Sequence, residues 1–297
     1  MTLRPATRAD FDAIADLFEA GVDLYDELEF ERSEMDQWLT SPRLDVERDI
    51  RLYEEDGRLL AYVDVDPLGD DPVMWWSDVR VHPEADVAAV VPSLLSWAAS
   101  RAGGGLLRTW APSSFTALTK EFERAGMRRL RGSYRMEVDL DDDVATPPEI
   151  EGVQIRPLAA GQERIAYNVH QETFEDSWDH VREPYDEWRH YLVDIDSYDP
   201  SLWLVAWDGD EPAGISLGRI RGDVGWIGIL GVRRAWRRRG VGRALLLHSF
   251  REFRDRELTR AGLGVDAESL TGAHKLYAAA GMRVVRELGH YEKPVPA

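Results

Sequence analysis

The chain has 297 residues, of which 44% are hydrophobic and 31% charged, and its formal net charge is −19 at pH 7. This length suits about two domains of ordinary size, and the excess of acidic groups argues against a nucleic acid as the main partner, because two polyanions repel each other. There is no cysteine, which excludes disulfides, thiolate metal sites and a cysteine nucleophile.

The sequence shows neither a membrane span nor an export signal. No apolar run approaches the roughly 20 residues that a membrane-spanning helix needs, and the first residues, Met-Thr-Leu-Arg-Pro, lack the apolar segment of a signal peptide. We therefore expect a cytoplasmic protein with neither a membrane nor a nucleic acid as its partner.

Two short motifs occur twice. Leu3-Arg4-Pro5 recurs as Ile155-Arg156-Pro157, and Ala125-Gly126-Met127-Arg128 recurs as Ala280-Gly281-Met282-Arg283. The offset between the copies stays between about 151 and 157 residues. The sequence therefore predicts two copies of one domain, at 1–140 and 153–297, joined by the charged, proline-bearing linker 141–152.

Both copies mix helices and strands in the same order. In the first copy we expect helices over 9–21, 87–101 and 115–125, another helix ending at 39, a hairpin of strands over 51–54 and 58–66, strands over 75–81 and 106–111, and a closing strand pair over 128–140. In the second copy we expect strands over 153–156, 202–207, 213–219, 226–232 and 263–267, a closing strand pair over 283–294, and helices over 162–174, 184–192, 241 to about 260, and 271–280.

The stretch from Gly225 to Arg243 carries the strongest functional signal. An apolar strand leads through an arginine cluster into Gly240-Val241-Gly242, where a helix begins. Glycines at a helix N-terminus let the main chain approach an anion closely, and the free amides there favour negative charge. The arginines of the cluster are Arg233, Arg234, Arg237, Arg238, Arg239 and Arg243. The pattern predicts a phosphate or pyrophosphate site.

This stretch resembles the acetyl-CoA-binding motif of the GNAT (Gcn5-related) N-acetyltransferases. The family pattern, a strand ending in Leu-x-Val and then Arg/Gln-x-x-Gly-x-Gly/Ala, is matched by Leu230-Gly231-Val232 and by Arg237-Arg238-Arg239-Gly240-Val241-Gly242. The resemblance implies two tandem domains with a mixed α/β (α+β) sheet, acetyl-CoA as the cosubstrate and no metal. It implies cofactor contacts from these residues, from Arg243, and from Ser269, which stands where the family commonly has asparagine.

The resemblance also assigns catalytic roles. The family's last helix pattern matches 269–282 and makes Tyr277 the acid that protonates the departing thiolate, while main-chain amides at the end of strand 226–232 stabilise the oxyanion. The first copy has Phe122 in place of this tyrosine and the acidic run 84–89 in place of the arginines. We therefore expect acetyl-CoA binding and catalysis in the second copy alone.

Strand 226–232 carries no carboxylate that could serve as general base. Candidates elsewhere are His170, Glu172, Glu175, Asp176 and Asp223, and a chain of water molecules is an alternative. An aromatic group, consisting of Phe174, Trp178, Tyr185, Trp188 and Tyr191, either lines the acceptor pocket or forms core on helix faces.

The expected activity is transfer of acetyl from acetyl-CoA to a primary amine of a small molecule, by direct attack. We expect the chain to act as a monomer, since two copies form an internal pseudo-dimer. The missing strand carboxylate leaves a second function open, a non-catalytic acyl-CoA-binding sensor or regulatory protein.

Overall fold

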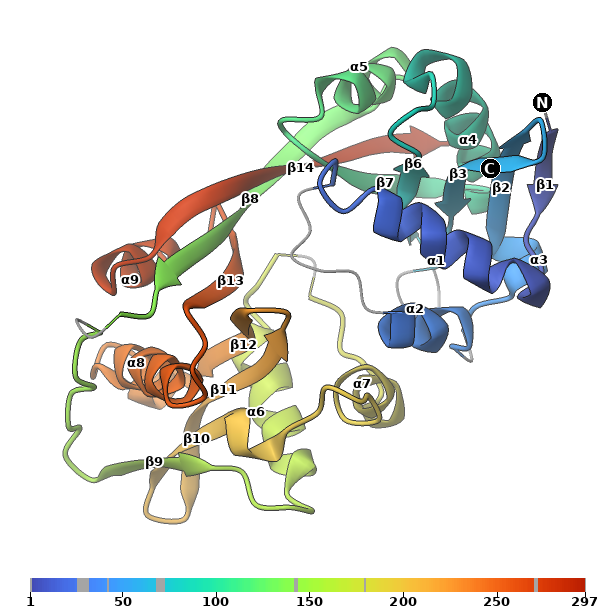
Figure 1. Cartoon of the computed structure of the whole chain (residues 1–297). Helices are drawn as coiled ribbons and strands as arrows, with labels where there is room; N and C mark the ends of the chain where they lie inside the picture. Colours follow the sequence, from blue (N-terminus) through green and yellow to red (C-terminus); the bar gives the residue numbers. More distant parts are fainter. Residues whose placement is uncertain are drawn as a thin grey trace. The chain divides into compact units, whose positions relative to one another are not determined.

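The computed structural model describes residues 2–25, 32–41, 43–67, 73–141, 144–178, 180–269 and 272–296. These residues form mixed α/β structure in two compact units (Figure 1). The first unit comprises 1–133 and 286–297, and the second comprises 134–285. The end of the chain therefore belongs to the first unit, so the compact units differ from the two copies that the repeated motifs mark at 1–140 and 153–297. Those copy boundaries stay a prediction.

The first unit combines helices with two groups of hydrogen-bonded strands. Its helices are α1 (Phe11–Ala20), α2 (Arg32–Leu39), α3 (Val46–Asp49), α4 (Val87–Ala102) and α5 (Thr116–Arg124), with a 3-10 turn η1 (Arg8–Asp10). One group of strands has the order β1 (Thr2–Pro5), β2 (Ile50–Glu55), β3 (Arg58–Asp64), β6 (Val79–Val81), and the other has the order β4 (Asp66–Pro67), β5 (Met74–Trp76), β7 (Gly105–Pro112), β14 (Arg283–Val295). Helix α1 forms because Ile14, Leu17 and Phe18 recur at helical spacing, and all three are buried.

The strand expected over 75–81 is interrupted. β5 pairs in parallel with β7, with Trp76 opposite Arg108, whereas β6 pairs antiparallel with β3, with Val79 opposite Val63. The two residues at 77 and 78 belong to neither strand. The pairing with β7 therefore ends at this break, and the chain continues as β6, which does not pair with β7.

The second unit is a sheet with helices on both faces. Its strands lie in the order β8 (Arg128–Asp139, from residue 134 on), β13 (Arg260–Asp266), β12 (Val224–Val232), β11 (Glu211–Arg221), β10 (Trp203–Asp208), β9 (Val153–Pro157). Its helices are α6 (Glu163–Phe174), α7 (Tyr185–Leu192), α8 (Val241–Arg254) and α9 (Ala273–Ala279), with 3-10 turns η2 (Pro200–Leu202) and η3 (Arg234–Trp236). β12 pairs antiparallel with β11 and in parallel with β13, because α8 provides the crossover that a parallel pair needs (Figure 1).

Glycines bring the two main helices close to β12. A Cβ atom at Gly225 would lie 2.2 Å from the ring of Phe253 on α8, and one at Gly231 would lie 2.3 Å from the Thr173 hydroxyl on α6. The strand therefore has α8 on one face and α6 on the other. Over the described ranges, no helix has both the length and the apolar content that crossing a bilayer requires.

The expected mixed α/β class is confirmed, but three details are wrong in addition to the interrupted strand over 75–81. Each closing strand pair is a single long strand, β8 or β14. Helix α8 ends at Arg254 rather than near 260, because Leu258 N–H bonds back to the Phe253 carbonyl and Glu257 takes φ 63°. Glycine usually occupies the left-handed position that ends a helix, but here the residue is Glu257, so the sequence does not predict this helix end. The strand expected over 263–267 starts at 260, and Thr271, the expected start of the last helix, lies outside the described residues.

A buried ion pair holds β14 in the first unit. Glu292 on β14 is opposite Arg108 on β7, and Arg108 Nε donates to the Glu292 carboxylate at 3.1 Å. The two side chains are 7% and 4% exposed, and Arg128 bonds the other carboxylate oxygen. Since both charges have lost most of their hydration, each needs the other within the protein.

We predict that Glu292→Gln lowers the free energy of unfolding of the first unit by about 3 kcal/mol, because it removes the carboxylate charge that faces the buried guanidinium of Arg108. The matched control is Glu287→Gln on the same strand. Glu287 pairs with Arg129 at the surface, and we expect its loss to cost less than about 1 kcal/mol. Denaturant unfolding of both variants measures the difference, and equal effects would contradict this role of Glu292.

Candidate active site

Two neighbouring strands of the second unit part from each other halfway along. β12 pairs with β13 from Val224 opposite Arg260 to Ile227 opposite Leu263, and no further. β12 nevertheless runs on to Val232, and its register against β11 shifts between Ile227 and Ile229, where Gly228 is the extra residue. A bulge of this kind bends a strand and increases its twist, which separates β12 from β13.

The parting leaves main-chain groups of β12 without a strand partner. Just after β12, Arg233 N–H donates to the carbonyl of Ala213 on β11, at 2.9 Å. Because bonded positions alternate along an antiparallel pair, the N–H and C=O of Leu230 and Val232 point away from β11 and into the gap. Arg237 Nε donates to the Val232 carbonyl at 3.0 Å, which agrees with this orientation.

Helix α8 begins beside this gap. A Cβ atom at Gly242 would lie 3.5 Å from both Val232 and Leu276 side chains and 4.0 Å from Leu230, so the start of α8, the end of β12 and α9 meet here. Gly240 is the N-cap residue, with φ 87°, and no side chain caps the helix. The amides of 241–243 precede the first hydrogen bond of the helix, from Ala244 to Gly240, and are therefore available to an anion.

Most arginines of the cluster bind acidic side chains of the protein itself. The pairs are Arg233 with Glu172 at 2.8 Å, Arg234 with Asp176 at 2.5 Å, Arg237 with Asp176 at 3.4 Å, and Arg239 with Asp208 at 3.7 Å. Arg237 also donates to the Thr173 carbonyl at 3.3 Å, so it ties the end of α6 to the end of β12. These four arginines thus build the loop that precedes α8.

Arg238 and Arg243 differ from the rest of the cluster. Neither forms an ion pair with any residue that the structure describes, and Arg238 is exposed in a left-handed conformation, with φ 63°. A non-glycine residue held there is strained, which is common where a loop presents groups to a ligand. Of the six arginines expected to bind an anion, these two are the ones the protein leaves uncommitted.

Tyr277 lies on α9, which packs against β13 on the other side of the gap. It is buried, and burial raises the pKa of its hydroxyl to about 12. Its carbonyl accepts from Met282 N–H, as the Phe122 carbonyl accepts from Met127 N–H, so the two positions are equivalent. Ser269 lies in the turn between β13 and α9, and its amide donates to the Asp266 carbonyl at 3.2 Å.

The carboxylates considered as general bases lie against arginines. Glu172 pairs with Arg233, and Asp223 pairs with Arg260 at 2.8 Å. Arg234 holds the pKa of Asp176 below its usual range, and Arg234 lies 3.9 Å from Glu175. Because its charged form is stabilised, Asp176 is a weak base.

His170 is also poorly suited to accept a proton. Burial lowers its pKa to about 4, so its ring is neutral at pH 7. Trp188 Nε1 donates to His170 Nδ1 at 2.9 Å, which leaves the hydrogen on Nε2.

Of the aromatic group that either lines the acceptor pocket or forms core, Trp188 belongs to the core, because it is fully buried with Tyr167 and Trp203. Phe174 and Tyr185 pack against the same cluster, Tyr191 is half-buried, and Trp178 is 37% exposed.

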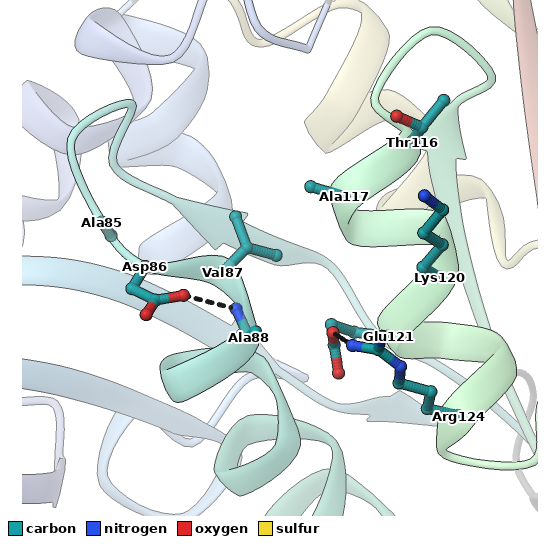
Figure 2. Close-up of a pocket in the computed structure, with 9 residues that line it drawn as sticks. All are labelled: Ala85, Asp86, Val87, Ala88, Thr116, Ala117, Lys120, Glu121 and Arg124. Atoms are coloured by element: carbon teal, nitrogen blue, oxygen red, sulfur yellow. Dashed lines mark hydrogen bonds and ion pairs between the residues drawn. The ribbon is translucent and has the colours of Figure 1, made fainter.

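The first unit has a different helix start at the equivalent place. Asp86 is the N-cap residue of α4, and its carboxylate accepts from the amides of Ala88 and Ala89, at 3.0 and 3.4 Å. This carboxylate lies beside a cavity of about 410 Å³ between α4 and α5, and Figure 2 shows the residues that line it. The cap was not predicted above, although aspartate just before a helix is a recognised cap signal in a sequence.

Comparison with known proteins identifies the group to which this chain belongs. The model of the Acetyltransferase (GNAT) family matches residues 164–282. A mycothiol acetyltransferase of Kineococcus radiotolerans is 30% identical over 231 residues, which are 76% of this chain and 75% of the relative. The chain belongs to the GNAT acetyltransferase family. A mycothiol acetyltransferase of Mycolicibacterium vanbaalenii is 27% identical over 78% of both chains.

Solved structures agree with this membership. A GCN5-related N-acetyltransferase from Sphaerobacter thermophilus has a TM-score of 0.79 at 28% identity, over 100% of this chain and 96% of its own. A tandem GNAT protein from the clavulanic acid biosynthesis pathway has a TM-score of 0.78 at 14% identity, over 100% and 99%. The tandem arrangement inferred from the repeats, which is similar to that of mycothiol synthase, is therefore confirmed.

Membership makes the protein an acetyl-transferring enzyme, and GNAT enzymes use acetyl-CoA. The residues present fit this cosubstrate, because the uncapped start of α8 and the open amides of β12 lie together. Within the described ranges, no three His, Asp or Glu side chains are grouped as metal ligands.

The different roles of neighbouring arginines lead to a prediction. Arg237→Ala should lower the free energy of unfolding by about 1–2 kcal/mol, because two main-chain carbonyls lose their donor. Arg238→Ala should leave stability unchanged and weaken coenzyme A binding by about tenfold. Denaturant unfolding and calorimetric titration measure the two effects. A stability loss for Arg238→Ala as large as that for Arg237→Ala would contradict the assignment.

Proposed function

We propose that the second unit transfers an acetyl group from acetyl-CoA to a primary amine of a small molecule. The observation that carries this proposal is the meeting of an uncapped helix start with unpartnered strand amides, one suited to phosphate and the other to a carbonyl oxygen. Relatives named mycothiol acetyltransferases support a small-molecule acceptor.

In this proposal the ends of the cosubstrate are bound by different elements. The amides of 241–243, with Arg238 and Arg243, bind the pyrophosphate, while the paired Arg237 and Arg239 keep the loop in shape. Ser269 contributes a further polar contact. The amides of Leu230 and Val232 donate to the acyl arm, and acetyl-CoA supplies the activated acetyl group. Gly231 lets α6 approach and close the side of the gap.

Tyr277 serves as the acid. Because burial raises its pKa to about 12, the phenol keeps its proton throughout the neutral range and can give it to the thiolate that leaves. No hydrogen bond to another described residue occupies this hydroxyl, so it is available for that role.

The amine reaches the reactive neutral form without a carboxylate base. Glu172, Asp176 and Asp223 are held by arginines, and His170 keeps its Nε2 hydrogen. We propose that water removes the proton, so the rate should rise with pH as the acceptor amine itself titrates. We further propose that catalysis is confined to the second copy and that the chain acts as a cytoplasmic monomer.

The test is release of free coenzyme A thiol from acetyl-CoA in the presence of a panel of small primary amines. We expect release with at least one amine, and loss of coenzyme A binding in Gly240→Glu, which adds both strain and negative charge at the helix start. Ala88→Glu, at the start of α4, is the control, since we expect no coenzyme A binding in the first unit. Tight binding without release for every amine would support the sensor instead.

We predict that Tyr277→Phe lowers kcat by about 100-fold or more while the Kd for coenzyme A changes by less than about twofold, because only the proton donor is lost. Tyr134→Phe is the control, since Tyr134 packs against the same cluster without a catalytic assignment. Steady-state kinetics and titration measure both quantities. Unchanged turnover would remove Tyr277 from the mechanism.

A further inference from the structure

In the first unit, too, neighbouring strands separate, and there the side chain of Tyr25 fills the gap between them. Tyr25, which follows α1, is 2% exposed. Its hydroxyl donates to the Val79 carbonyl and accepts from the Val81 amide, both at 2.9 Å. Both partners lie on β6, the strand that has separated from β7.

These two main-chain groups are the counterparts of those left open in the second unit. His82 N–H donates to the Leu60 carbonyl just after β6, as Arg233 N–H donates to Ala213 just after β12. Because bonded positions alternate along the antiparallel pair of β3 and β6, the main-chain N–H and C=O groups of Val79 and Val81 point away from β3 and into the gap. Val79 and Val81 thus correspond to Leu230 and Val232.

The ring of Tyr25 is fixed from several sides. It packs edge-on against Trp110 of β7, with ring centres 6.2 Å apart, and against Phe115 at 5.6 Å. The buried guanidinium of Arg80 lies 4.5 Å from the centre of the Tyr25 ring and 4.9 Å from that of Trp110. Arg80 occupies the position that corresponds to Gly231, where α6 approaches the second unit's strand. Tyr25 therefore spans the gap from β6 to β7.

The first amides of helix α4 in the first unit are likewise bonded by a side chain of the protein itself. The Asp86 carboxylate accepts from the amide of Ala88 (Figure 2) and from that of Ala89, and these amides are the counterparts of the free amides at the start of α8. Gly240 holds the equivalent N-cap position and has no side chain to do this. One internal hydroxyl and one internal carboxylate thus satisfy both parts of the first unit's pseudo-site.

We propose that Tyr25 and Asp86 are built-in substitutes for an acyl-CoA ligand, which bond the main-chain groups of the pseudo-site and keep the first unit stable without one. The naming of the ligand rests on the function proposed for the second unit. The chain then binds one coenzyme A, in the second unit, and Tyr25 acts as a structural plug whose hydroxyl replaces ligand atoms at β6.

The plug is tested first by stability. Tyr25→Phe keeps the ring but leaves the Val79 carbonyl and the Val81 amide unbonded, so the unfolding midpoint of the first unit should fall by about 5 °C. Tyr53→Phe, in the same buried cluster, should change it by less than about 1 °C. Equal shifts in the two variants would overturn the role of the hydroxyl.

Tyr25→Ala gives a direct test of the space. If the side chain fills a ligand-shaped gap, p-cresol should raise the midpoint of this variant and leave the wild type unchanged, because small aromatics bind cavities that large-to-small changes open. Failure of p-cresol to stabilise a folded Tyr25→Ala protein would count against the plug. If this variant does not fold, the Tyr25→Phe comparison decides.

Stoichiometry separates this inference from the proposed function. Titration of the wild-type chain with coenzyme A should give one site, which Arg238→Ala weakens and Lys120→Ala, in the first unit's cavity, does not. No binding at all would refute the proposed function while leaving the stability result for Tyr25 to stand. Two sites per chain, one of them sensitive to Lys120→Ala, would overturn the proposal that the first unit binds no coenzyme A.

Discussion

Where two strands of a sheet part, the main-chain amides and carbonyls along the parting need other partners, because an unbonded buried peptide group is costly. β12 leaves β13 after Ile227, and β6 leaves β7 at the break before Val79. Much of the molecule is arranged around these two places. In the second unit the groups of Leu230 and Val232 face the gap, and in the first unit Tyr25 takes the groups of Val79 and Val81.

The same contrast extends to the helices that follow. An aspartate N-cap satisfies the first amides of α4 from within the chain, whereas a glycine N-cap leaves those of α8 for an external anion. A duplicated domain can in this way keep its fold while one copy loses the need for a ligand. The core of the first unit then depends on internal contacts, including the buried pair of Glu292 and Arg108, rather than on a bound cosubstrate.

The charged side chains act through local ion pairs rather than through the net charge of the chain. The chain carries a formal charge of −19, and most arginines before α8 are matched by nearby acids such as Asp176 and Asp208. Such pairs give the loop a definite shape, which places Arg238 and Arg243 near the helix start. A rigid loop with two uncommitted cations loses less freedom on binding an anion than a flexible loop with six would.

The sequence by itself determined the family, the duplicated α/β fold and the helix that begins at Gly240-Val241-Gly242, because these depend on local spacing, glycine conformation and hydrophobic period. It also distinguished Tyr277 from Phe122 by position. Only the tertiary structure decided that Arg237 is tied to Val232 and Thr173, that β14 completes the first unit, and that Tyr25 reaches Val79 and Val81. Those contacts join residues from roughly five to nearly two hundred positions apart, and no local pattern records which distant groups the folded chain brings together.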